Sequence, residues 1–177
     1  PNGEMFGRGP NADIPLQVII RTIQPVAFPA NTYDLTFSMC TASWESGTGS
    51  LGCPGLAGDP LGSVSLLEQP SLESGLNSET AFLTRPNLAI DGWIRGRFPA
   101  YYVSDFDHFI TEVGCLNGSP NCHLTFQVDY RATDGSSGRL GRWREAYDGQ
   151  TTMIDIDLSG LAGKAIQLIL TVENMGN

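Results

Sequence analysis

The chain has 177 residues, of which 41% are hydrophobic and 16% charged, and its formal net charge is −9 at pH 7. A chain of this length and composition is expected to bury one core and form a single domain. The negative charge, the single lysine and the scattered arginines argue against nucleic-acid binding, which needs clustered basic residues.

The chain begins at Pro1, without an initiator methionine, a signal peptide or a purification tag. It is therefore expected to be a mature, processed product or a trimmed region of a longer one. No apolar run reaches the length of about 18 residues that a membrane helix needs, so no membrane insertion is predicted.

The first segment has two parts. Residues 1–13 have the composition of a linker, and residues 14–20 then alternate, with four aliphatic side chains predicted on one face: Ile14, Leu16, Val18 and Ile20. Residues 1–23 are therefore predicted to be an extended N-terminal arm that carries a candidate donor strand. Residues 24–177 are predicted to be one domain.

The next segments are less regular. Residues 33–39 alternate and predict a strand with Leu35, Phe37 and Met39 inward. Residues 43–62 are rich in glycine and proline and are interpreted as one long loop. An extended segment follows at 64–67, and residues 71–77 could form a helical turn.

The second half contains shorter, clearer strands. Alternating or apolar runs separated by turn sequences predict strands at 106–113, 123–130, 140–147, 154–158 and 165–172. Short strands without a long helix indicate an all-β protein, an antiparallel β-sandwich.

The four cysteines form two close pairs in sequence, Cys40 with Cys53 and Cys115 with Cys122. Close spacing within Gly/Ser/Pro-rich segments favours two local disulfides, although four cysteines allow three connectivities. Each bridge would contribute about 2–3 kcal/mol on the chain-entropy model. Disulfides predict an extracellular or cell-surface location. A zinc site is the disfavoured alternative, because neither spacing suits one.

Three sequence stretches resemble the secreted carbohydrate-binding β-sandwich modules of the galactose-binding-like jelly-roll kind, especially the NPCBM type. They are residues 106–115 (FDHFITEVGC), 124–128 (LTFQV) and 154–161 (IDIDLSGL). The resemblance covers roughly residues 94–177 and implies a jelly-roll-like β-sandwich, with glycan binding as an alternative function. Such modules continue beyond the strand that corresponds to residues 165–172 with a closing, Trp-containing strand, which this chain lacks.

The last predicted strand is followed by Asn174-Met175-Gly176-Asn177, a turn with no strand after it. An unpaired sheet edge can pair with a strand of another chain. We therefore expect an acceptor edge along residues 165–172, formed by Ile166, Leu168, Leu170 and Val172. The segment 14–20 is the candidate strand that would fill it.

Several residues are candidates for binding or modification. Trp44, Trp143 and Tyr147 are candidate glycan contacts, since aromatic rings stack on sugars; burial in the core is the alternative for each. Asp105, Asp107 and Asp134 are candidate calcium ligands, calcium being the one cofactor considered. Asn117 begins an Asn-Gly-Ser sequon in a predicted loop.

No catalytic residue is predicted. His108 lies in no nucleophile motif, and Asp155 and Asp157 are interpreted as solvated carboxylates on the outer face of a strand. The sequence therefore predicts a non-enzymatic extracellular structural protein, the subunit of a fibre or cell-surface assembly. Its partner would be another copy of the chain, joined by strand donation. The alternative is a glycan-binding module of a larger secreted enzyme or adhesin.

Overall fold

The computed structural model describes the backbone of residues 17–19 and residues 33–75 and 80–175 in full. The described residues form an all-β fold with two antiparallel sheets and two short 3-10 turns, η1 (Met39–Thr41) and η2 (Ser159–Leu161). The predicted all-β class is therefore confirmed. No helix among the described residues is long and apolar enough to cross a membrane.

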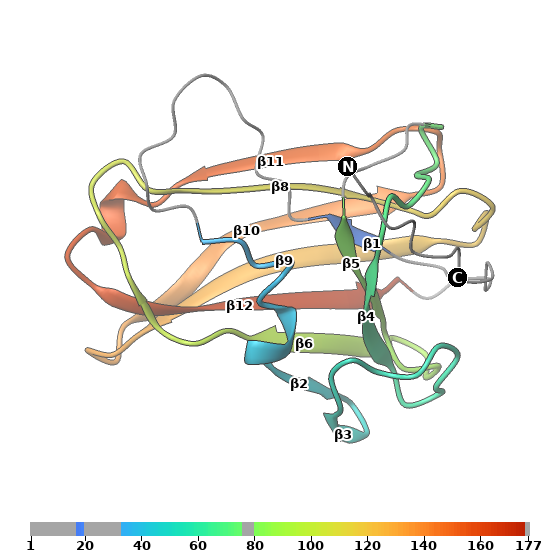
Figure 1. The fold of residues 1–177 in the computed structure, drawn as a ribbon, viewed down its shortest axis with the longest axis horizontal. Helices are drawn as coiled ribbons and strands as arrows, with labels where there is room; N and C mark the ends of the chain where they lie inside the picture. The colour runs from blue at the N-terminus through green and yellow to red at the C-terminus, as the bar shows by residue number, and fades with distance from the viewer. Residues whose placement is uncertain (1–16, 20–32, 76–79, 176–177) are drawn as a thin grey trace, which may run out of the picture.

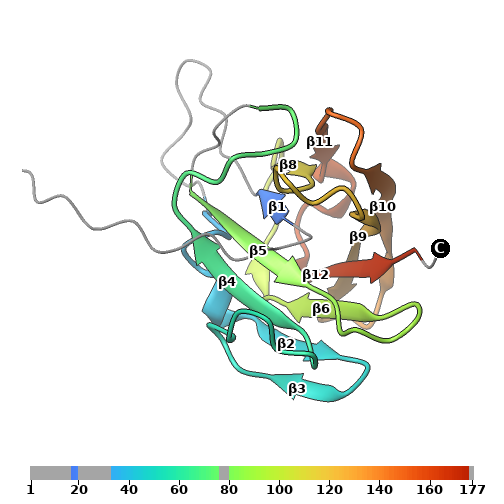
Figure 2. The ribbon, with the colours of Figure 1, turned by 90° about the vertical axis from the view of Figure 1, so that its right-hand side faces the viewer.

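Sheet A has five strands, and β1 lies at its centre (Figures 1 and 2). Its order is β11 (Thr152–Asp157), β8 (His108–Gly114), β1 (Gln17–Ile19), β5 (Ala81–Arg85) and β4 (Ser63–Leu67). Neighbouring strands pair antiparallel throughout the sheet.

Sheet B has seven strands, and the ten-residue β12 lies near its middle. Its order is β10 (Ser137–Ala146), β9 (His123–Ala132), β12 (Ala165–Asn174), β6 (Trp93–Arg97), β2 (Ser43–Ser46) and β3 (Gly49–Leu51), with β7 (Tyr101–Tyr102) also paired to β12.

The two sheets bury their inner faces in one shared core. Phe82, Phe109 and Ile154 from sheet A belong to the same buried cluster as Phe126 and Leu170 from sheet B. A void of about 20 Å³ between the sheets, roughly the size of one water, is lined by strands of both. Apolar residues from the strands of both sheets thus build the core from both sides.

Two predicted elements in the first half are wrong. Residues 33–39 form turns that lead into η1, because the Asp34 carboxylate accepts the backbone N–H groups of Thr36 and Phe37. Phe37, predicted to face inward, is exposed. Residues 43–62 are not one loop, since β2 and β3 form a hairpin around Gly47 and Thr48.

The predicted acceptor edge is also wrong. β12 pairs with β9 over nearly its whole length and with β6 and β7 on its other side. Ile166, Leu168, Leu170 and Val172 are all buried in the core. A strand whose backbone groups are paired on both sides offers no free edge to an incoming strand.

Both predicted disulfides are present. Cys40–Cys53 ties η1 to the segment after β3, and Cys115–Cys122 closes the loop between β8 and β9. Disulfide bonds are typical of proteins that work outside the reducing cytoplasm.

Candidate functional site

The centre of sheet A depends on β1. Val18 pairs with Phe82 of β5 on one side and with Val113 of β8 on the other. Gln17 and Ile19 continue the pairing with β8, opposite Gly114 and Glu112. Among the described residues, β1 is the only strand that joins β5 to β8.

β1 lies between two longer strands. The structure describes three residues of β1, whereas β8 has seven residues and β5 has five. These three residues pair with residues 112–114 of β8. The other predicted residues of the donor segment, Ile14, Leu16 and Ile20, lie outside the described residues. Together, β5 and β8 border a one-strand gap in sheet A, and β1 fills it.

The predicted glycan contacts do not form a stacking surface. Trp44 is only 4% exposed, and its ring meets Phe82 and Phe98 edge-on with centroids 5.9 and 6.2 Å apart. This prediction is wrong for Trp44, since a sugar cannot reach either face of its ring. Trp143 and Tyr147 are half-buried and pack against the same core.

The sequon residue Asn117 and the candidate calcium ligand Asp134 both lie on loops and bond to neighbouring side chains. Asn117 is exposed, and its side-chain oxygen accepts a hydrogen bond from the Tyr147 hydroxyl at 3.1 Å. Asp134 accepts hydrogen bonds from Ser136 and forms an ion pair with Lys164 at 3.1 Å. The hydrogen bonds from Ser136 hold the pKa of Asp134 down at about 2. Asp105 and Asp107 lie on another loop.

No metal-binding group was found in the part of the chain that the structure describes: no three His, Cys, Asp or Glu side chains there are placed to hold an ion. Asp105, Asp107 and Asp134 are thus not brought together. Asp107 instead accepts a hydrogen bond from the Ser104 backbone at 2.8 Å.

His108 and Asp155 form a polar pair on the outer face of sheet A. The His108 Nδ1 atom lies 2.6 Å from the Asp155 carboxylate, and this hydrogen bond raises the pKa of the imidazole. Both side chains are well exposed. Within the described residues, no hydroxyl or thiol is hydrogen bonded to His108.

The outer face of sheet B carries a feature that the sequence analysis missed. Six of the nine arginines gather on it, from three strands: Arg95, Arg97, Arg131, Arg139, Arg142 and Arg144. We call this surface the arginine face. Only three strand carboxylates share it: Glu45, Asp129 and Glu173.

A β-bulge places three of these arginines together. The pairing of β10 with β9 shifts between Arg139 and Gly141, which leaves Leu140 without a partner. In a regular strand, Arg139 and Arg142 would face opposite sides, because side chains alternate with a period of two. The extra residue puts both on the outer face, with Arg144 beyond them, and turns Trp143 and Glu145 inward.

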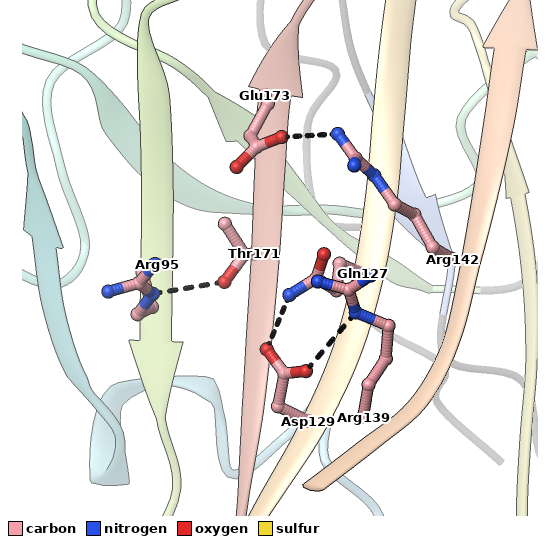
Figure 3. A network of polar contacts seen from close by, with 7 residues as sticks. All are labelled: Arg95, Gln127, Asp129, Arg139, Arg142, Thr171 and Glu173. Atoms are coloured by element: carbon pink, nitrogen blue, oxygen red, sulfur yellow. Dashed lines mark hydrogen bonds and ion pairs between the residues drawn. The ribbon is translucent and has the colours of Figure 1, made fainter.

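Polar contacts hold the arginine face in place (Figure 3). Arg142 contacts Glu173 at 2.8 Å, and Arg139 lies 3.8 Å from Asp129. The Arg95 Nε atom donates to the Thr171 hydroxyl at 3.0 Å.

Glu45 completes the set of contacts from β2. Its carboxylate lies 2.6 Å from Arg97 and 3.6 Å from Arg95, and the hydrogen bond from Arg97 lowers its pKa. The Arg95 guanidinium also lies over the Trp93 ring, 4.9 Å from its centroid.

Part of the arginine face is hollowed into an open groove of about 670 Å³. Four arginines line it, together with Asp129, Tyr130 and Ile169: Arg95, Arg97, Arg131 and Arg139. A groove with this lining can hold a negatively charged group by charge-assisted hydrogen bonds.

Comparison with known proteins places the chain in no family. No family model, no curated protein and no solved structure matches it.

Proposed function

We propose that the chain is a non-enzymatic structural subunit of an extracellular assembly, and that copies are joined when segment 14–20 of one enters the gap between β5 and β8 of the next. Main-chain hydrogen bonds to β5 and β8 would give the joint its continuity. This location replaces the edge of β12, whose backbone is already paired on both sides.

One observation carries the proposal: the two halves of sheet A, β4–β5 and β8–β11, are joined only through β1 among the described residues. Such a strand works as a separate piece, since its pairing partners lie far from it in the sequence. A subunit that needs this piece can take it from any copy that presents it.

In the single chain, β1 fills the chain's own gap, which is also the arrangement expected of an autonomous module. An element that fits its own subunit fits an identical neighbour equally well, which is the basis of domain swapping. Burial of four aliphatic side chains in a neighbour would contribute about 1.5–3 kcal/mol each before ordering costs.

The two disulfides support an extracellular setting, because they stabilise small domains that work outside the cell. The alternative function, a glycan-binding module, loses its best-placed aromatic residue to the core, since Trp44 is buried. We therefore prefer the structural role.

Engineered disulfides can reveal the origin of the strand. All four native cysteines are paired, so a new cysteine has no free native thiol to react with. Ile19 lies opposite Glu112 in the pairing of β1 with β8. We expect a mixture of Ile19→Cys and Glu112→Cys chains to form covalent dimers under mild oxidation, visible on a non-reducing gel.

The matched control replaces Glu112→Cys by Ser50→Cys, which lies on β3 of the other sheet and should not cross-link to Ile19→Cys. A chain that carries both Ile19→Cys and Glu112→Cys tests whether the strand pairs within its own chain. If it closes only an internal bridge, and the mixed single variants stay monomeric, the strand is the chain's own and donation between subunits is wrong.

A further inference from the structure

We propose a second contact between copies, in which the arginine face of one chain docks on an acidic strip of another. The acidic strip is the outer face of β8 and β11, formed by Glu112, Asp155 and Asp157. The inference rests on the proposed assembly, because that assembly holds copies of the chain close together. It differs from strand donation in the surfaces and forces involved.

The uneven distribution of charge is the first argument. Six arginines against three carboxylates give the arginine face a net charge of +3, in a chain whose total is −9. The rest of the chain therefore carries −12. Copies of such a chain repel each other through most of their surface, and the arginine face is the surface that can attract a second copy.

The acidic strip is the second argument. Asp155 lies opposite Ile110, and Asp157 lies opposite His108, so these side chains stand in rows on the outer face of sheet A. His108 stands in the same rows and hydrogen bonds to Asp155, so the strip holds three carboxylates and one imidazole. Met153, opposite Glu112, adds an exposed apolar side chain to the same surface. Hydrogen bonds from Ser159 lower the pKa of Asp157, which keeps its charge at neutral pH.

The third argument is that two arginines of the arginine face form no ion pair within the described residues. Arg131 and Arg144 are exposed, and within the described residues neither has a carboxylate in ion-pair range. The groove beside Arg131 is open and about 670 Å³ in volume, which leaves room for protruding side chains. The two surfaces belong to different sheets, so the contact joins unlike faces and leaves one of each free.

A charge-swap experiment on the full chain tests the contact. Arg131→Glu with Arg144→Glu reverses the arginine face, and Asp155→Lys with Asp157→Lys reverses the acidic strip. At about 50 mM NaCl, where charges are weakly screened, each variant alone should need at least about tenfold more protein than wild type to associate in light scattering. A 1:1 mixture should associate like wild type, because each variant keeps one native face that attracts the other.

Other results would overturn the contact. If both variants associate like wild type, or if the mixture stays as weak as each variant alone, the two faces do not meet. If dextran sulfate binds wild type but not the arginine-face variant while self-association is unchanged, the face serves a polyanion instead. Circular dichroism of each variant checks that it is folded.

Salt separates this contact from strand donation. At about 1 M NaCl the screening length falls to about 3 Å, so the charge contact should dissolve while strand-joined copies persist. If the wild-type assemblies dissociate completely into monomers at high salt, strand donation is contradicted and the charge contact is supported. If the charge variants form the same assemblies as wild type at low and high salt, the charge contact is contradicted and strand donation is supported.

Discussion

Trp44 shows how one side chain couples the two sheets. It belongs to β2 of sheet B, yet its ring contacts Phe82 of sheet A. Its indole N–H donates to the Met39 carbonyl at 2.8 Å, so the polar atom is satisfied in the core. Gly96 faces the ring, and a Cβ atom there would come within 2.7 Å of it.

Replacing this ring should therefore cost stability. We expect Trp44→Ala to lower the free energy of unfolding by about 3–5 kcal/mol, because it leaves a large cavity. Gly96→Ala should also destabilise, since the new methyl group overlaps the ring. Urea unfolding followed by circular dichroism measures both. Leu56→Ala, at an exposed position, is the control, and an equally small effect at Trp44 would contradict its assignment to the core.

Glu145 is a buried carboxyl group between the edges of the two sheets. It accepts a hydrogen bond from the Thr152 hydroxyl of β11 at 2.9 Å. Burial raises the pKa of Glu145 to about 7, and the nearby carboxylates of Glu73 and Asp148 add to this shift. The folded chain thus holds a proton more tightly than the unfolded chain, whose carboxyl group has an ordinary pKa of 4.5.

The stability that this proton contributes is complete below the unfolded pKa and is lost as pH rises through about 7. Glu145→Gln stays neutral at every pH. We expect it to reduce the fall in unfolding free energy between about pH 5 and pH 8, by about 1–3 kcal/mol. The exposed carboxylate variant Glu68→Gln is the control. Equal pH profiles for wild type and Glu145→Gln would contradict the shift.

At the scale of elements, the bulge in β10 decides which face each residue occupies. Deleting Leu140 would make the pairing with β9 regular, because Gly141 would follow Arg139 directly and stay opposite Val128. Arg142 and Arg144 would therefore remain on the outer face. We expect the deletion to lower the free energy of unfolding by about 1–2 kcal/mol in urea, because the partly buried Leu140 side chain no longer packs against the core. A deletion without effect would show that neither the bulge nor its side chain is needed for stability.

β1 permits a test in trans. A chain lacking residues 1–23 should unfold at lower urea concentration, since sheet A loses the strand between β5 and β8. A synthetic peptide of residues 14–20 should restore part of this stability, and a scrambled peptide should not. If the shortened chain is as stable as the full chain, β1 is dispensable for the domain.

Alternation explains which strands could be predicted from the sequence. In β9 and β12, which have ten residues each, apolar and polar residues alternate, so the sequence alone identifies their inward side chains without information on the adjacent strands. Residues 33–39 also alternate, but the local hydrogen bonds of Asp34 favour turns. The hairpin of β2 and β3 lies in a glycine-rich segment whose composition hides it.

Strand order explains what could not be predicted. The two gaps that matter, at β1 and at the supposed edge of β12, depend on which strands become neighbours. The arginine face has the same origin, because Arg95 and Arg139 are far apart in sequence and meet on a sheet through the strands between them. The alternation within a strand can be recognised in a single sequence, whereas the identity of the neighbouring strands cannot.

At the scale of the whole molecule, the charged surfaces lie on the outer faces of different sheets, and this should be visible in solution. We expect the association of wild-type chains to weaken steadily with added NaCl, by about tenfold between 50 and 500 mM, as expected for a contact between opposite charges. Analytical ultracentrifugation measures this. A flat profile would point to apolar or main-chain contacts alone.

The direction of β1 has a consequence for growth. β1 runs antiparallel to both β5 and β8, so those two strands run parallel to each other and an inserted strand satisfies both in one direction only. Every joint made this way would have the same orientation, and a growing polymer would be polar. One tip would expose an empty slot and the other an unused strand. Preformed polymers treated with peptide 14–20 and then freed of unbound peptide would be blocked at the first tip and would still grow at the second.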